Sequence, residues 1–155
     1  MGSPKSPPDS KTFTEMIGRL NGIEGEPRSA VLITHLYTEY LLDYILRKKL
    51  LTPEKVIKRR FASKLELIES FGMLYPPLMH DLWIVNDIRN LFAHRIDIES
   101  SEFNEEFKKK INEMNFYKDQ PRLAQIPTYP TYNMIMMRIY ALLYDFLDRM
   151  PNPET

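Results

Sequence analysis

The stretch PRSAVLITHLYTEYLLDYILRKKL, residues 27–50, says most about the fold of this chain. It opens on Pro27, which suits the first turn of a helix, it ends in a basic run from Arg47 to Lys49, and it holds neither glycine nor an internal proline. Its apolar residues cover most of the helical circumference, so we expect a long helix buried on several sides. Such a helix fits the middle of a bundle or a dimer interface.

Proline, glycine and capping residues divide the rest of the chain into further helices. Thr52 and Pro53 are typical of a helix start, Gly72 is typical of a helix end, and Pro76 with Pro77 opens another helix. We expect helices from Thr52 and over residues 61–71, 76–95, 102–114 and 131–150, with an irregular crossing at 115–130. No stretch alternates as a strand does. The predicted fold class is therefore all-α, a helical bundle of about five to six helices.

The composition fits one domain without a dominant charge. Of the 155 residues 43% are hydrophobic, which is enough to bury one core. We expect a single helical domain over residues 11–150, between a disordered tail at 1–10 and a short tail at 151–155. Lys plus Arg and Asp plus Glu each total 21, so no overall basic excess draws the chain to nucleic acid or to a membrane.

Cysteine and histidine usage narrows the chemistry. The chain has no cysteine and three widely spaced histidines, so we predict no disulfide, no thiol nucleophile, no metal site and no cofactor. No apolar run is long enough for a membrane span and no signal peptide stands at the start, so we expect a cytoplasmic protein without a membrane partner. Two long helices with apolar circumferences exceed what a monomer of this size needs, which favours a homodimer.

The segment Arg89-Asn90-Leu91-Phe92-Ala93-His94, near the end of the helix at 76–95, carries the one sharp chemical signal. At about 100° per residue, Asn86, Asn90 and His94 follow one another on one polar stripe, with Asp87 beside them. The opposite side of this helix is apolar and is expected to face the core.

Arg89 lies about 140° around the helix from His94, among the apolar residues, and a cation there needs a partner. It can extend past the core to solvent, pair with Glu39 or Asp43 of the long helix, or reach the other chain's histidine across a dimer axis. His35, Glu39 and Asp43 recur at steps of four. We interpret them first as buried polar partners of Arg89 and only second as catalytic groups.

Arg89, Asn90 and His94 allow a structural and a functional interpretation. In the structural one, His94 caps its helix while Arg89 and Asn90 satisfy each other. In the functional one, histidine moves a proton near neutral pH, arginine holds a phosphate through two parallel hydrogen bonds, and asparagine orients either group. That set suffices for metal-free RNA cleavage, in which the substrate's own 2′-hydroxyl is the nucleophile. It serves equally as a phosphate-binding pocket without catalysis.

Three pieces of the sequence together resemble the HEPN superfamily. They are residues 27–32, residues 61–65 with 72–74, and residues 88–94, in the family's order and over roughly residues 15–100. HEPN proteins are helical domains that include many dimeric, metal-independent ribonucleases of toxin–antitoxin and phage-defence systems. The chain looks most similar to the mannitol operon repressor-like branch, and the region after about residue 100 has no counterpart in the resemblance.

The resemblance implies a role for each motif residue. Arg89 would stabilise the phosphate, His94 would act as general acid or base, and Asn90 would hold both in place, with two such motifs facing each other across a dimer interface. The expected partners are a second copy of the chain, RNA, and an antitoxin or regulatory protein. Because many members of the repressor-like branch are not shown to be nucleases, the alternative is a non-enzymatic regulatory or interaction module on the same fold. No DNA-reading element stands out.

The chain also carries one local basic run, residues 47–64. Its candidate RNA-binding residues are Lys55, Lys58, Arg59, Arg60 and Lys64. In one interpretation they form a track for phosphates that leads to the motif. In the other they are a solvated turn between two helices.

Overall fold

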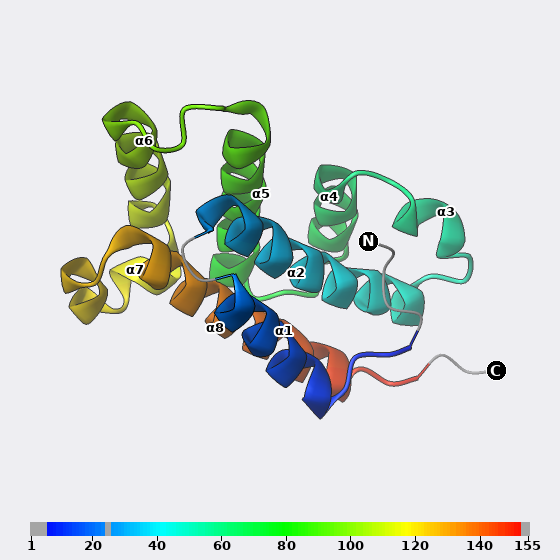
Figure 1. The fold of residues 1–155 in the computed structure, drawn as a ribbon. Helices are drawn as coiled ribbons and strands as arrows, with labels where there is room; N and C mark the ends of the chain where they lie inside the picture. The colour runs from blue at the N-terminus through cyan, green and yellow to red at the C-terminus, as the bar shows by residue number, and fades with distance from the viewer. Residues whose placement is uncertain (1–5, 24–25, 153–155) are drawn as a thin grey trace.

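The computed structural model describes residues 6–23 and 26–152, and every regular element within them is a helix (Figure 1). In chain order the elements are α1 (Ser10–Gly22), α2 (Pro27–Lys49), α3 (Glu54–Ile57), α4 (Phe61–Phe71), α5 (Pro76–His94), α6 (Ser101–Asn112), α7 (Asn115–Lys118), the 3₁₀ helix η1 (Pro121–Gln125) and α8 (Thr128–Arg149). The predicted all-α class is confirmed. The described residues hold eight α-helices rather than five to six, because the sequence interpretation did not find α1 and α7.

Local signals explain several helix ends. Pro27 and Pro76 stand in the first turns of α2 and α5, and Gly72 ends α4 in the left-handed conformation with a φ of 63°. Ser100 caps α6, since its hydroxyl accepts from the Phe103 amide at 3.1 Å.

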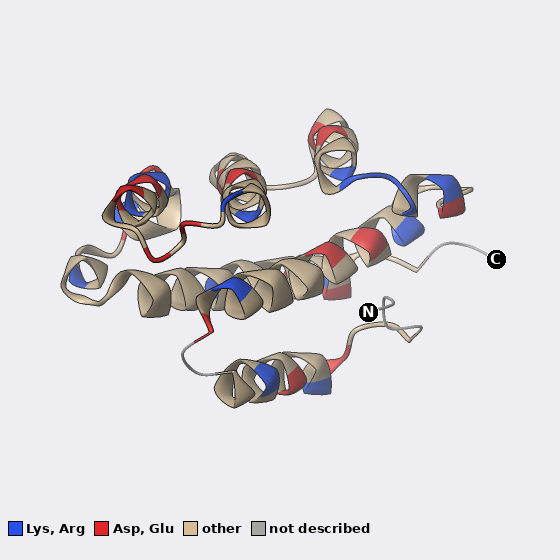
Figure 2. Ribbon diagram, turned by 45° about the horizontal axis from the view of Figure 1, so that its top comes forward, with Lys and Arg blue, Asp and Glu red and all other residues tan. Residues whose placement is uncertain are grey.

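The helices pack in layers, which Figure 2 shows well. The long helices α2 and α8 lie along each other in the middle, with α1 on one side and α4, α5 and α6 on the other (Figures 1 and 2). The core between the layers is aliphatic and aromatic, and Leu41, Leu42, Val85 and Ile139 in it are fully buried. The expected burial of the long helix is confirmed, and α4 and α5 both pack against α2.

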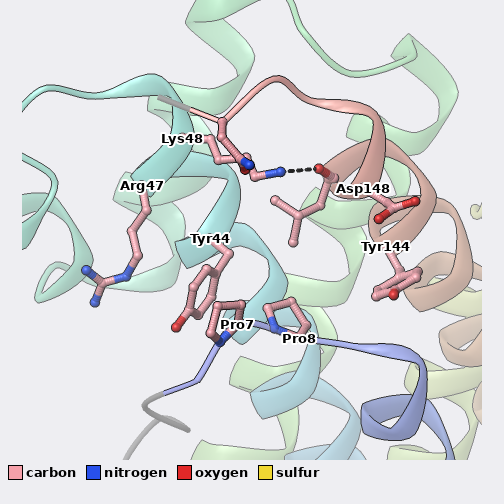
Figure 3. Close-up of a pocket in the computed structure, with 9 residues that line it drawn as sticks. Pro7, Pro8, Tyr44, Arg47, Lys48, Tyr144 and Asp148 are labelled. Atoms are coloured by element: carbon pink, nitrogen blue, oxygen red, sulfur yellow. Dashed lines mark hydrogen bonds between the residues drawn. The ribbon is translucent and has the colours of Figure 1, made fainter. Parts of the chain in front are cut away.

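The start of the described chain packs on the domain, although we expected residues 1–10 to be a disordered tail. Residues 1–5 lie outside the described part. The Tyr40 hydroxyl donates a hydrogen bond to the Ser6 carbonyl, and Pro7 and Pro8 lie beside Tyr44 (Figure 3). The helical domain therefore begins before residue 11.

The start of α1 and the crossing at 115–130 depend on side-chain caps. The Asp9 carboxylate accepts from the Lys11 amide at 2.9 Å and so begins α1. Asp81 of α5 is fully buried and accepts from the amides of Asn115 and Phe116 at 2.8 and 3.0 Å, which begins α7. The crossing is therefore less irregular than we expected.

Among the described residues, no helix is long and apolar enough to cross a membrane.

Candidate functional site

The end of α5 is anchored firmly, and this fixes where the motif points. Phe92 is buried and lies edge-on to the rings of Phe103 and Phe107, with centroids 4.8 and 5.0 Å away. Just past the helix, Arg95 pairs with Asp97 at 2.6 Å and with Glu106 at 2.9 Å. The core face of α5 therefore holds Phe92 with Leu91 partly buried against it, and the polar stripe faces outward, as the periodicity predicted.

The outward stripe of α5 forms one wall of a cavity of about 640 Å³ between α2, α4 and α5. The residues that line it are His35, Glu39, Arg60, Phe61, Ala62, Asn86, Arg89, Asn90 and His94. The structure thus brings together all three motif residues with Asn86. Arg89 is half-buried and reaches the same cavity as His94 in spite of the angle between them on the helix. Its long side chain extends past the core edge, which is one of the three arrangements that we considered.

The polar groups of the motif are not used up by internal contacts. Within the described part of the chain, no hydrogen bond or ion pair reaches the side chains of Arg89, Asn90 or His94. The structural interpretation, in which Arg89 and Asn90 satisfy each other, is therefore wrong for this structure. A guanidinium, an amide and an imidazole are left to meet a ligand or solvent in one cavity.

Glu39 and Asp43 have a different partner from the one that we expected. Both pair with Lys64 of α4, Glu39 Oε1 at 2.8 Å from its Nζ and Asp43 Oδ1 at 2.7 Å. His35 Nε2 lies 3.4 Å from the other oxygen of Glu39. The prediction that these acids hold Arg89 is wrong, because Lys64 enters the space between α2 and α4 and takes both carboxylates.

Burial and pairing set the charge of the two acids. Burial raises the pKa of Glu39, but hydrogen bonds from His35 and Lys64 and the Lys64 charge outweigh it and lower this pKa to about 2. Burial is the larger effect at Asp43 and raises its pKa in spite of Lys64. Glu39 is therefore an ionised carboxylate at neutral pH, and it is part of the cavity wall.

The basic run divides into exposed and buried cations. Lys55, Lys58, Arg59 and Arg60 are exposed, and Figure 2 shows the Lys and Arg run at the connection between α3 and α4. Arg60 also lines the cavity, so this exposed run reaches the motif. Lys64 is only 1% exposed, and its place among the RNA-binding residues is a wrong prediction because its charge is neutralised by two acids.

Other cations of the run have structural contacts. Lys48 Nζ donates to the Leu147 carbonyl at 2.9 Å (Figure 3) and to the Met150 carbonyl at 3.1 Å, and these bonds join the end of α2 to the end of α8. The neighbouring cavity of about 300 Å³, between Tyr44, Tyr144 and the N-terminal prolines, holds no second cluster like the motif. Among the residues that the structure describes, no three His, Cys, Asp or Glu side chains gather as a metal site would require.

Asp87 lies apart from the motif, although the sequence placed it beside the polar stripe. Its carboxylate is 3.6 Å from Lys110 of α6, and it does not line the cavity.

The sequence interpretation missed Phe61, whose ring centroid lies 4.3 Å from that of His35 and which forms an apolar edge of the cavity. Its place at the start of α4, next to Arg60, was the available signal.

Comparison of the chain with models of protein families, with curated proteins and with solved structures found no match. The resemblance to the HEPN superfamily therefore stays a prediction that rests on the three quoted pieces of sequence.

Proposed function

We propose that this protein is a metal-independent endoribonuclease of the toxin or defence type, with Arg89, Asn90 and His94 as its active-site residues. The observation that carries this proposal is the cavity itself. It gathers two imidazoles, two guanidiniums, two amides and one carboxylate, and within the described residues none of the motif side chains has an internal partner. Buried structural polar groups are usually satisfied inside the protein, so the half-buried Arg89 without an internal partner fits a site that binds a ligand.

The proposed reaction is transfer of the phosphoryl group to the neighbouring 2′-oxygen. The bond from the 2′-oxygen to phosphorus forms while the bond from phosphorus to the 5′-oxygen breaks, which leaves a 2′,3′-cyclic phosphate and a 5′-hydroxyl. One imidazole takes the proton from the 2′-hydroxyl and an acid gives a proton to the 5′-oxygen. Arg89 stabilises the charge that grows on the phosphate oxygens, and Asn90 orients the phosphate.

His35 of the same cavity is buried and lies 3.4 Å from Glu39, so a dimer is the source of a second unpaired histidine for this reaction. One chain contributes His94 as base, and we propose that the His94 of a second copy is the acid. Leu32 and Leu36, close to His35 in the sequence of α2, are 37% and 42% exposed, and Ile96, two residues after His94, is almost fully exposed. These three exposed apolar residues, which we call the apolar rim, are suited to contact with a second copy.

A regulatory or interaction module is the second candidate, and a different surface favours it. A groove of about 730 Å³ runs between α1, α2 and α8, and its lining includes Leu20, Ile23, Tyr129, Met134 and Met137. Met134 is 46% exposed. Methionine-lined grooves adapt to the apolar face of a partner helix, such as one from an antitoxin or regulatory protein.

Incubation of the purified protein with total RNA in the presence of a chelator tests the proposal. We expect fragments that end in a 2′,3′-cyclic phosphate, detected by their resistance to a ligase that needs a free 3′-hydroxyl. RNA that stays intact at high protein concentration would favour the regulatory module.

A further inference from the structure

Glu39 is an unexpected group in a cavity that is proposed to hold a phosphodiester. It is the one acid among the described residues that line this cavity, whereas arginine and histidine supply the opposite charge. Its side chain is 27% exposed, so the carboxylate reaches the cavity from α2. A fixed anion repels phosphate, so a ligand must compensate for it with donors of its own.

The carboxylate is held in one orientation. Lys64 Nζ lies 2.8 Å from one oxygen of Glu39, and His35 Nε2 lies 3.4 Å from the other oxygen. An ionised carboxylate accepts hydrogen bonds only and has about four acceptor positions, so each oxygen keeps one for a ligand. Two acceptors side by side match a ligand with two N–H donors side by side.

Among the four RNA bases, guanine has that pair of donors, N1–H and the 2-amino group. Adenine and cytosine place a ring nitrogen acceptor beside their amino group, and uracil places a carbonyl on each side of its N3–H, so each brings a lone pair against the carboxylate. The edge of Phe61 offers an apolar contact for the base, and Arg60 and Arg89 lie in the same cavity for the phosphate.

We propose that Glu39 makes this cavity selective for guanine, by accepting hydrogen bonds from N1–H and the 2-amino group while Arg89 binds the adjoining phosphate. The inference rests on the proposed ribonuclease function and names the base at the cleavage site. Lys64 acts as a positioning residue, because it turns the Glu39 carboxylate toward the cavity without touching the ligand.

Calorimetric binding of three 3′-monophosphates, of guanosine, inosine and uridine, to the whole protein in a chelator tests this proposal. Inosine lacks only the 2-amino group, so we expect the guanosine nucleotide to bind roughly tenfold more tightly than inosine, the effect of one hydrogen bond to a charged group. Glu39→Gln should remove this difference. Glu66→Gln, at an exposed acid on α4 outside the cavity, should keep it.

The outcomes separate this inference from the proposed function. Equal binding of the three nucleotides by the wild-type protein, or binding of none, overturns the inference without any need for a variant. Cleavage at all four bases with equal rates overturns it as well but leaves the ribonuclease proposal in place. If the protein prefers guanine through Glu39 but never cleaves RNA, the inference is supported and the ribonuclease proposal is overturned.

Discussion

Lys64 Nζ lies 2.8 Å from Glu39 Oε1, so a buried cation of α4 is bonded to an acid that is part of the cavity wall on α2. The same ammonium is 2.7 Å from Asp43 Oδ1. One interaction thus joins the fold and the candidate site, because it packs α4 on α2 and also fixes the only acidic group among the described residues of the cavity lining.

Replacement of Lys64 by methionine should destabilise the protein. Methionine matches the length of the side chain but leaves two buried acids without their cation, which costs about 3 to 5 kcal/mol. Urea unfolding of Lys64→Met measures the loss, and Lys58→Met, at an exposed lysine, is the matched control. Equal stability of the two variants would show that the buried ion pair does not hold α4 on α2.

Acid should weaken the fold through Glu39. Hydrogen bonds lower the pKa of this residue in the folded protein from about 4.5 to about 2 in spite of burial. A carboxyl with a lowered pKa stabilises the fold fully above its unfolded value and loses that contribution as the pH falls toward its folded value. The free energy of unfolding should therefore fall between pH 4.5 and 2, and the fall should be shallower for Glu39→Gln. Parallel curves for the two proteins would contradict the assignment.

The sequence predicted the helices better than their contacts. Pro27, Gly72 and Pro76 carry local signals, and each marks a helix end in the structure. The burial of Lys64 was also available from the sequence, since it stands on the apolar stripe of α4 between Phe61 and Leu65. Because Lys64 is charged, we interpreted it as an exposed RNA-binding residue. A lysine on such an apolar stripe instead needs buried acids as partners.

The exposed part of the basic run should govern the salt dependence of RNA binding. Reversal of Lys58, Arg59 and Arg60 to Glu should weaken binding and flatten its salt dependence, by roughly one unit of slope for each phosphate that the protein no longer binds. The matched control reverses Lys108 and Lys109, which are exposed on α6 and do not line the cavity. A salt slope that the first reversal leaves unchanged would identify the run as a solvated turn.

Light scattering of the dilute protein should report about twice 18.4 kDa. A charge at Leu36 should shift the protein toward the monomer, because this residue is 42% exposed on α2 in the proposed apolar rim. Leu36→Glu tests the prediction, and Leu51→Glu, at a fully exposed leucine in the connection to α3, is its control. A wild-type monomer at every concentration would remove the second His94 from the proposed reaction.

The sequence placed the motif residues correctly on their helix but indicated their surroundings only in part. Periodicity located Asn90 and His94 on an outward stripe, which depends on one helix alone. The partner of Glu39 depends on how α2 and α4 are rotated against each other, and side-chain packing between helices decides this. For that reason Lys64 took the place that we had assigned to Arg89.

We propose that His94 has a chemical role and no structural one. His94 is exposed at the last position of α5, and within the described residues its imidazole has no hydrogen bond or ion pair. Removal of its side chain should therefore cost little stability. His80, an exposed histidine near the start of the same helix and outside the cavity, provides the control for activity; its ring contacts Asp81 and Asn115, so its removal can lower stability without affecting cleavage.

The role of His94 is tested by RNA cleavage in a chelator, measured beside the melting temperature for the wild type, His94→Ala and His80→Ala. We predict that His94→Ala melts within a few degrees of the wild type while cleavage falls by at least about two orders of magnitude, the usual contribution of a general acid or base. His80→Ala should cleave RNA as the wild type does. A His94→Ala protein that cleaves at the wild-type rate, or a wild type that leaves RNA intact, would contradict the account.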